Sequence, residues 1–394
     1  MENLNHLFYS ESDVFADIAI NAEKDLSSIS NSYRGNKRKL FKHFAKIMHD
    51  YKICDSANNG IALDLFSGSG YMGFLLKRMG YAVWCNDFLS SSYLNAVSLV
   101  ENPGFMPTNE EISFVLNNIY ENIDIYLQDK YKSKFTLDEQ KKLVSFICNI
   151  ENILGQSVSD IISQEGRQCI SKVSSLGEKS IDVSSLRSFY IYSMILCAIN
   201  HCVMSHCDVG GRLNKGEIIA KLDHRLNHAR NKGEEMRFSN LKIFQKSFDI
   251  GRKCLATNED VYKVLEYENR PNIDLVYIDP PYGGEQSDYA DMYNFFEDYL
   301  KIKSTEKPKK FVNKKEYAND FDLLLKKLPQ EADWVFSYNN SSWTDIDQII
   351  DYIKRYRSSI FVEDVNYKYN YRSTNNVNDA KSTEYFIIAR RSHV

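Results

Sequence analysis

The run Asp279-Pro280-Pro281-Tyr282 joins a carboxylate, two rigid prolines and an aromatic ring. It directly follows the apolar stretch 273–278, which is typical of a buried strand. A strand end of this kind can accept hydrogen bonds from an amino group while its aromatic ring stacks on a flat ring. The run therefore indicates chemistry on the exocyclic amine of a nucleobase. A strand followed by a plain Pro-Pro turn is the purely structural alternative.

A second motif, 64–70, begins with an acid at the end of a short apolar strand and leads through glycines toward a helix. Gly68 and Gly70 permit a tight turn and the close approach of a ligand to the backbone. With Gly73 the spacing also matches the GxGxxG dinucleotide pattern. The chain has no GxxxxGK[ST] sequence, which excludes a P-loop.

Two acids favour a methyl donor over a dinucleotide in this half of the chain. Asp64 would repel a pyrophosphate and attract an ammonium group. Asp87 follows the second strand and can accept both ribose hydroxyls, while Phe88 beside it can stack on adenine. S-adenosylmethionine has the ammonium and the ribose and carries no phosphate, so we expect it as the cofactor.

Composition indicates one large or two ordinary globular domains. The chain has 394 residues, 43% hydrophobic and 26% charged. It shows no signal-peptide pattern and no 18-residue apolar run. The longest apolar stretch, 189–204, is interrupted by Asn200 and His201 and is expected to be a buried helix. We therefore expect a cytoplasmic protein that does not enter a membrane.

The eight cysteines form no CxxC pair, which fits reduced thiols. One cluster has four-residue helical spacings that suit zinc, and its apolar neighbours favour buried thiols instead. We expect no metal there; the cluster comprises Cys197, His201, Cys202, His206 and Cys207.

The net charge of −4 argues against a protein that coats nucleic acid non-specifically. Three basic runs flank the two motifs, at 34–46, 212–237 and 301–315. Together they favour a local basic groove, and a solvated face is the alternative for each one.

Alternating strands and helices predict an α/β fold with a mostly parallel sheet and helices on both faces. The expected elements are strands 61–63, 81–85, 241–244, 273–278 and 334–338, helices 71–79 and 344–357, and an antiparallel C-terminal edge made by strands 360–367 and 384–388. Between 100 and 239 only helical stretches are expected, at 112–126, 137–154 and 186–204. We therefore divide the chain into 1–99 with 240–394 and a mainly helical insert, 100–239.

Together, these motifs resemble the DNA adenine-N6 methyltransferases of the Dam-like (alpha) group, in which a target-recognition region lies between the cofactor and catalytic motifs. The resemblance implies a Rossmann-like methyltransferase fold, S-adenosylmethionine as cofactor, DNA as partner and target recognition by the insert. Segments 337–340, 369–373 and 383–385 resemble the C-terminal strand motifs of these enzymes.

The resemblance also assigns cofactor-binding residues. Segment 33–40 looks like the N-terminal cofactor motif, with Tyr33, Asn36 in place of the usual serine, and Lys37. Segment 64–70, including Phe66, matches the glycine motif. Phe248-Asp249 looks like the pair after the third strand that addresses the donor's adenine.

The same resemblance implies a mechanism. Asp279 and the carbonyl of Pro280 would accept the two amine hydrogens of adenine, Pro281 would stiffen the turn and Tyr282 would stack on the base. A duplex buries that amine, so the base must be flipped out or single-stranded. The aromatic residues Tyr289, Tyr293 and Phe295 either line the opening or belong to the core.

Three alternatives remain open. Cytosine-N4 methyltransferases usually begin the motif with serine, so Asp279 favours adenine. An RNA adenine-N6 methyltransferase and a catalytically silent nucleic-acid-binding module are the others. Candidates for reading DNA bases are Arg212, Arg225, Arg230 and Arg237, and a cognate restriction endonuclease is a possible partner.

Overall fold

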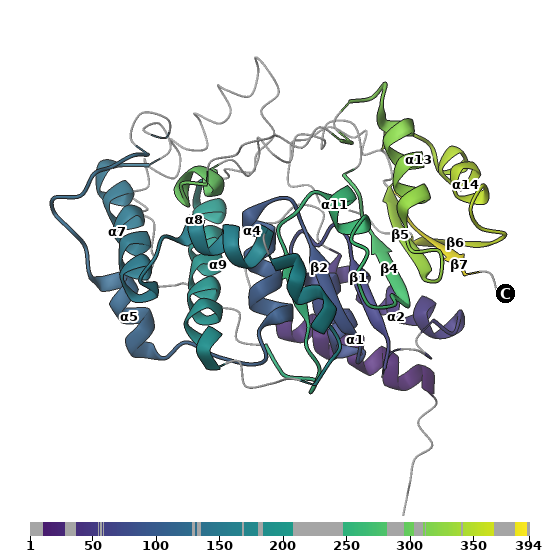
Figure 1. The fold of residues 1–394 in the computed structure, drawn as a ribbon, viewed down its shortest axis with the longest axis horizontal. Coiled ribbons are helices and arrows are strands. Elements are labelled where there is room, and N and C mark those ends of the chain that lie inside the picture. Colours follow the sequence, from purple (N-terminus) through teal and green to yellow (C-terminus); the bar gives the residue numbers. More distant parts are fainter. Residues whose placement is uncertain are drawn as a thin grey trace, which may run out of the picture.

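The computed structural model describes residues 11–27, 37–53, 55, 57, 59–127, 131, 135–167, 169–179, 184–207, 247–281, 295–302, 310–311, 313–339, 342–365 and 383–391; within these ranges the side chains of 11–13, 167, 169–171 and 204–207 are excluded. A seven-stranded sheet with the order β3-β2-β1-β4-β5-β7-β6 forms its centre (Figure 1). The strands are β1 Ile61–Asp64, β2 Ala82–Asn86, β3 Leu255–Thr257, β4 Leu275–Ile278, β5 Asp333–Asn339, β6 Ser359–Val365 and β7 Glu384–Arg390.

The first five strands run parallel and the C-terminal pair forms an antiparallel edge. β1 pairs with both β2 and β4, and β4 pairs with β5, all in parallel. β7 runs antiparallel to both β5 and β6. This mixed sheet confirms the predicted α/β architecture and its antiparallel edge.

Helices cover both faces of the sheet because successive strand residues point to opposite sides. In β4, Leu275 and Tyr277 join the core on the side of α2 and α3, whereas Val276 and Ile278 join the core on the side of α11 and α13. The helices around the sheet are α1 Glu11–Ser27, α2 Phe41–Asp50, α3 Tyr71–Arg78, α4 Ser90–Ala96, α11 Val261–Leu265, α13 Tyr317–Lys327 and α14 Ile346–Lys354.

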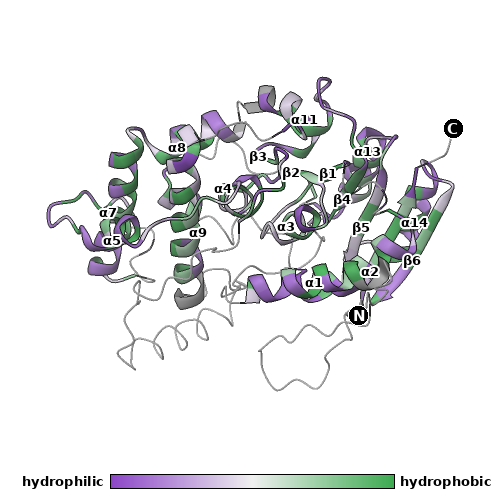
Figure 2. Ribbon diagram, turned by 90° about the horizontal axis from the view of Figure 1, so that it is seen from below, coloured by the Kyte–Doolittle hydropathy of each residue, from purple (hydrophilic) through white to green (hydrophobic). Residues whose placement is uncertain are grey.

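The described residues between 100 and 207 form helices α5 Asn109–Asn117, α7 Leu137–Leu154, α8 Val158–Ile161 and α9 Arg187–Cys207. They lie to one side of the sheet in Figure 1. Figure 2 shows that α9 is hydrophobic along most of its length. Its buried residues share one core with those of α4 and α7, which explains why the apolar stretch 189–204 forms a buried helix as predicted.

Two predicted elements differ from the structure. The helix expected over 112–126 ends at Asn117, because buried Asn149 of α7 donates to the carbonyls of Val115 and Asn118 at 2.9 and 2.8 Å and so satisfies the end of α5. The third strand of the sheet is Leu255–Thr257, which pairs with β2. It was missed because a three-residue strand has too little alternation to detect. The strand expected at 241–244 lies outside the described residues.

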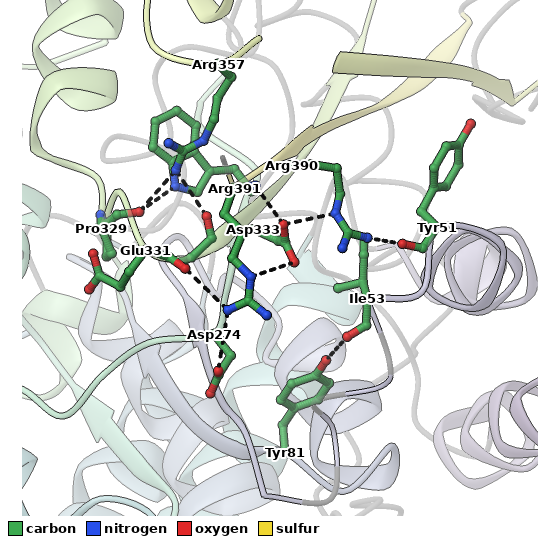
Figure 3. Close-up of polar contacts among 12 residues, drawn as sticks. Tyr51, Ile53, Tyr81, Asp274, Pro329, Glu331, Asp333, Arg357, Arg390 and Arg391 are labelled. Carbon is green, nitrogen blue, oxygen red and sulfur yellow. Dashed lines mark hydrogen bonds and ion pairs between the residues drawn. The ribbon is translucent and has the colours of Figure 1, made fainter. Parts of the chain in front are cut away.

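A polar cluster fastens β7 to β5 at the amino end of β5 (Figure 3). Buried Asp333 accepts a hydrogen bond from the backbone N–H of Arg391 at 2.8 Å, and its carboxylate lies 3.1 Å from Nε of Arg390. Arg390 also donates to the carbonyl of Tyr51.

No helix in the described part of the chain is long and apolar enough to cross a membrane.

Asp333→Asn should lower the free energy of unfolding by about 1–3 kcal/mol, since it removes the charged acceptor of two arginines at a buried position. Urea denaturation at neutral pH measures this. Glu331→Gln is the matched control, because its ion pair with Arg270 is exposed and contributes about 0–1 kcal/mol. An unchanged denaturation midpoint for Asp333→Asn would contradict the expected role.

Candidate active site

The two key acids lie at the same edge of the sheet. β1 and β4 are adjacent parallel strands, with Asp64 opposite Tyr277, so Asp64 and Asp279 both stand at carboxyl ends. Ligands of open α/β sheets bind beyond such ends. The structure thus brings together the two motifs that the sequence separates, while Tyr282 lies outside the described residues.

Lys37 lies against Asp279. Its Nζ is 3.4 Å from Oδ1 of Asp279 and 2.5 Å from Oε1 of Glu384, the first residue of β7. Glu384 also accepts hydrogen bonds from Ser337 Oγ at 2.7 Å and from Asn339 Nδ2 at 3.1 Å. Burial acts to raise the pKa of Glu384, but Lys37 and these hydrogen bonds outweigh it and hold the pKa below its usual value.

The expected part of Lys37 in donor binding stays a prediction, since these contacts involve protein groups alone. Its pattern suggested donor binding, and the structure places its ammonium between two carboxylates. Tyr33 and Asn36 of the same motif lie outside the described residues. Lys37, a residue of the basic run 34–46, is therefore buried and does not contribute to an exposed basic groove. The run 212–237 and most of 301–315 also lie outside the described residues.

Asp64 is fully buried at the start of the glycine turn. Burial raises its pKa well above the usual value, the negative charge of Asp279 raises it further, and the N–H of Gly73 opposes both. Its Oδ1 atom has no hydrogen-bond partner within the described part of the chain. A buried carboxylate oxygen without a partner is rare and indicates a place for a donor group or a cation.

The turn after Asp64 has the backbone that its glycines permit. Gly68 and Gly70 have φ values of 49° and 74°, in the left-handed region, and α3 begins directly after Gly70. Gly68 N–H donates to Oδ2 of Asp87 at 2.8 Å. Phe66 packs edge-on against Phe311, with ring centroids 5.8 Å apart.

Asp87 and Phe88 follow β2, as the sequence predicts. Leu89 N–H donates to Oδ1 of Asp87 at 2.9 Å, and burial raises the pKa of Asp87 to about 6 against the effect of its hydrogen bonds. Asn258, which the sequence analysis missed, donates to the backbone carbonyls of Asp87 and Phe88 at 3.0 and 2.9 Å. The residue after β3 therefore fixes the turn that carries Asp87.

The assignment of Phe248-Asp249 to the end of the third strand is wrong. Both residues precede β3, and the residues that follow it are Asn258, Glu259 and Asp260. Phe248 packs on Phe74, with centroids 5.7 Å apart, and lies under the guanidinium of Arg78 at 4.2 Å. Arg78 ends α3, so this contact lies at the opposite edge of the sheet from Asp64. A competing apolar stretch at 241–244 caused the misassignment.

Glu297 is a further residue without a sequence signal. It lies in the helical segment 295–299, and its carboxylate accepts hydrogen bonds from Ser90 N–H at 2.7 Å and Ser90 Oγ at 2.8 Å. Phe295 is buried, with Tyr131 and Phe135 at centroid distances of 5.0 Å each, so it is a core residue. Tyr289 and Tyr293 lie outside the described residues.

The cysteine cluster on α9 packs as an apolar helix. Cys197 is a buried free thiol, 3.5 Å from Ser98 Oγ, and burial lowers the pKa of His201 to about 4. No group of three or more His, Cys, Asp or Glu side chains suited to a metal occurs among the described residues. The side chains of His206 and Cys207 are outside them.

Comparison with known proteins gives two matches. Residues 33–158 match the family model described as D12 class N6 adenine-specific DNA methyltransferase. The type II methyltransferase M2.HphI of Haemophilus parahaemolyticus is 24% identical over 366 residues, which cover 91% of this chain and 97% of that protein. No solved structure matches the chain.

The mostly parallel sheet with its antiparallel edge and flanking helices is that of a Rossmann-like methyltransferase fold. With the two matches, the protein is a site-specific DNA methyltransferase that acts on the N6 amine of adenine. The RNA-directed and binding-only alternatives find no support in these matches.

Close packing at Gly73 gives a test of the glycine turn. A Cβ at Gly73 would lie 2.3 Å from Cys85 Sγ and 3.3 Å from Oδ2 of Asp64. Gly73→Ala should therefore cost about 1–3 kcal/mol of stability, as overpacking does. Adding Cys85→Ala should recover part of that loss because it removes the colliding sulfur. Urea denaturation of both single variants and the double variant measures the coupling, and strictly additive losses would contradict the collision.

Proposed function

We propose that the protein transfers the methyl group of S-adenosylmethionine to adenine flipped out of duplex DNA. The observation that carries this proposal is the position of Asp64 and Asp279 at the ends of neighbouring parallel strands. One acid lies in the glycine turn and the other in the motif suited to an amine. A donor and an acceptor bound there would meet at one edge of the sheet.

The donor half fits S-adenosylmethionine. This group supplies an electrophilic methyl on a sulfonium when bound. Asp64, with an oxygen that lacks a described partner, would hold the ammonium group, and Asp87 would accept the ribose hydroxyls. Gly68 and Gly70 let the backbone approach the ligand, and Phe66 and Phe88 offer rings beside it. Tyr33 and Asn36 belong to the same proposal by resemblance.

Asp249 and Phe248 are not part of the donor site we propose. Phe248 lies at the far edge of the sheet, next to Arg78, and Asp249 accepts a hydrogen bond from Gly251 N–H at 2.8 Å. Glu259 and Asp260 occupy the position after β3 instead. Asp260 accepts a hydrogen bond from Tyr262 N–H at 2.9 Å, which caps α11, and Glu259 lies 3.3 Å from Lys263. Of the two, Glu259 is the acid we assign to the donor's adenine, since Asp260 is used as a cap.

At the acceptor half, Asp279 and the carbonyl of Pro280 would accept the two hydrogens of the adenine amine. The nitrogen lone pair would then be freed from the ring and could attack the methyl group in line, without a covalent enzyme intermediate. The bond from that methyl to the donor's sulfur would break and leave a thioether, and one amine hydrogen would leave as a proton through Asp279, whose side chain is 18% exposed to solvent. Pro280 and Pro281 lack backbone donors and stiffen the turn. Tyr282 would stack on the base. The catalytic contribution is positioning and electrostatics.

We assign DNA target recognition to 100–239, as in the Dam-like group. In support, α7 and the nearby Tyr131 form hydrogen bonds with the segment that follows the catalytic motif. Tyr299 OH donates to Leu143 O at 2.8 Å, and Tyr131 OH donates to Asp298. Direct base readout would fall to Arg212, Arg225, Arg230 and Arg237. Since a relative is a type II methyltransferase, we propose a cognate restriction endonuclease as partner. A DNA substrate suits a cytoplasmic enzyme.

Asp279→Ala should lower methyl transfer to duplex DNA by roughly a hundredfold or more while leaving donor binding in place, because it removes an acceptor needed in the transition state. Transfer of labelled methyl, followed by nucleoside analysis, measures the rate and the product. Asp274→Asn is the matched control at the amino end of the same strand, where the carboxylate accepts Ile61 N–H at 2.9 Å. Unchanged transfer by Asp279→Ala would overturn this mechanism, and methylation of RNA alone would overturn the DNA substrate.

Donor binding should depend on pH through Asp87. The raised pKa of about 6 means that Asp87 is ionised above pH 6 and becomes protonated below it. Ionised carboxylates accept hydroxyl hydrogen bonds more strongly, so S-adenosylmethionine affinity should fall as the pH drops through 6. Calorimetric titration of wild type and Asp87→Asn between pH 5 and 8 should show affinities that differ at pH 8 and converge at pH 5. A ratio that stays constant across this range would contradict the ribose contact.

A further inference from the structure

Glu384 has an unusual density of charged and polar partners for a fully buried residue. Lys37 Nζ, Ser337 Oγ and Asn339 Nδ2 all donate to its two carboxylate oxygens. Asn339 is its direct neighbour in the antiparallel pairing of β5 with β7. The side chain is therefore held by β5 on one side and on the other by Lys37, which precedes the 3-10 turn Arg38–Leu40 that leads into α2.

The same lysine reaches the acid of the catalytic motif. Lys37 Nζ lies 3.4 Å from Asp279 Oδ1, and the Asp279 side chain keeps 18% of its surface exposed, whereas those of Lys37 and Glu384 keep 2% and none. The ammonium thus has a strong, buried contact with Glu384 and a looser contact with Asp279. Solvent reaches only the carboxylate that would meet the substrate.

Because the Lys37 ammonium lies between two carboxylates, Glu384 decides how strongly Lys37 binds Asp279. A lysine with Asp279 as its one partner would bind that carboxylate tightly and compete with the adenine amine for its oxygens. With Glu384 as the closer partner, the lysine can orient Asp279 and still leave it able to accept. Other ionisable groups face this space, since the charge of Asp279 acts on Asp64, Tyr277 and Tyr317.

We propose that Glu384 is a positioning residue for methyl transfer, which holds Lys37 so that Lys37 orients Asp279 toward the adenine amine. Glu384 acts through Lys37 and touches neither the base nor the donor. The inference rests on the proposed role of Asp279 as the acceptor of the amine hydrogens.

Glu384→Gln tests the charge with little change of shape. Single-turnover methyl transfer to duplex DNA should fall roughly 10- to 100-fold, because a small misplacement of a reacting group has effects of this size. The dissociation constants for S-adenosylmethionine and for DNA should stay within about threefold. The acidic limb of the rate–pH profile should move to lower pH, since Lys37 would then stabilise ionised Asp279 alone. A purely structural part for Glu384 would not move that limb.

A double-mutant cycle tests the route through Lys37. In a Lys37→Met background, Glu384→Gln should change the transfer rate by less than about twofold, because the lysine that links Glu384 to Asp279 has been removed. The double variant also removes both members of the buried ion pair, and thermal unfolding checks that it is folded. Asp333→Asn is the matched control: it is a buried carboxylate between β5 and β7 at the other end of the strands, and its transfer rate should equal that of wild type.

Two results would overturn the inference. One is a wild-type rate and pH profile for Glu384→Gln, and the other is additive losses in the cycle. If Asp279→Ala is inactive and Glu384→Gln is normal, only this inference fails. If Asp279→Ala is active, the proposed function fails first.

Discussion

β1 and β4 are hydrogen-bonded in parallel, with Asp64 beside Tyr277, and this pairing brings two acids from distant parts of the chain to one edge of the sheet. Both strands are buried on both faces, so their register is fixed by the packing of α3 on one side and α13 on the other. A shift by one residue would turn every side chain of the strand to the opposite face. The site depends on that register more than on any single contact.

Gathering carboxylates in a buried space has an electrostatic cost, and the structure offsets it in two ways. At Asp64 and Asp87, backbone N–H groups of Gly73, Gly68 and Leu89 oppose the rise in pKa that burial causes. At Asp279 and Glu384, the compensation is a full positive charge on Lys37. Backbone amides therefore offset the burial of the carboxylates around the glycine turn, whereas an ion pair offsets it in the motif that follows β4.

In the described part of the chain, helices between 100 and 207 share a hydrophobic core with the helices beside the sheet. Residues of α9 and α7 continue the core that begins at α2 and α3. The segment 295–302 forms hydrogen bonds on two sides. Glu297 accepts from Ser90 near the glycine turn, and Tyr299 donates to Leu143 of α7. One short segment thus links the region assigned to target recognition with the turn that carries Asp87.

The sequence by itself determined the strand–helix alternation, the glycine turn and the acid at the end of β4. These signals are local, because the burial of a strand and the conformation of a glycine are encoded within a few neighbouring residues. It missed β3, whose three residues carry no usable periodicity, and so misplaced the acid that follows that strand.

Only the tertiary structure decided which charges meet. Lys37, Asp279 and Glu384 belong to three distant motifs, each of which was recognised, yet no spacing along the chain predicts that one lysine bridges the other two. Glu297 and Asn258 carried no sequence signal at all, because their roles arise from the neighbours that the sheet order and the helix packing give them. Local patterns specify which elements form. The partners of a buried charge follow from the three-dimensional order of those elements.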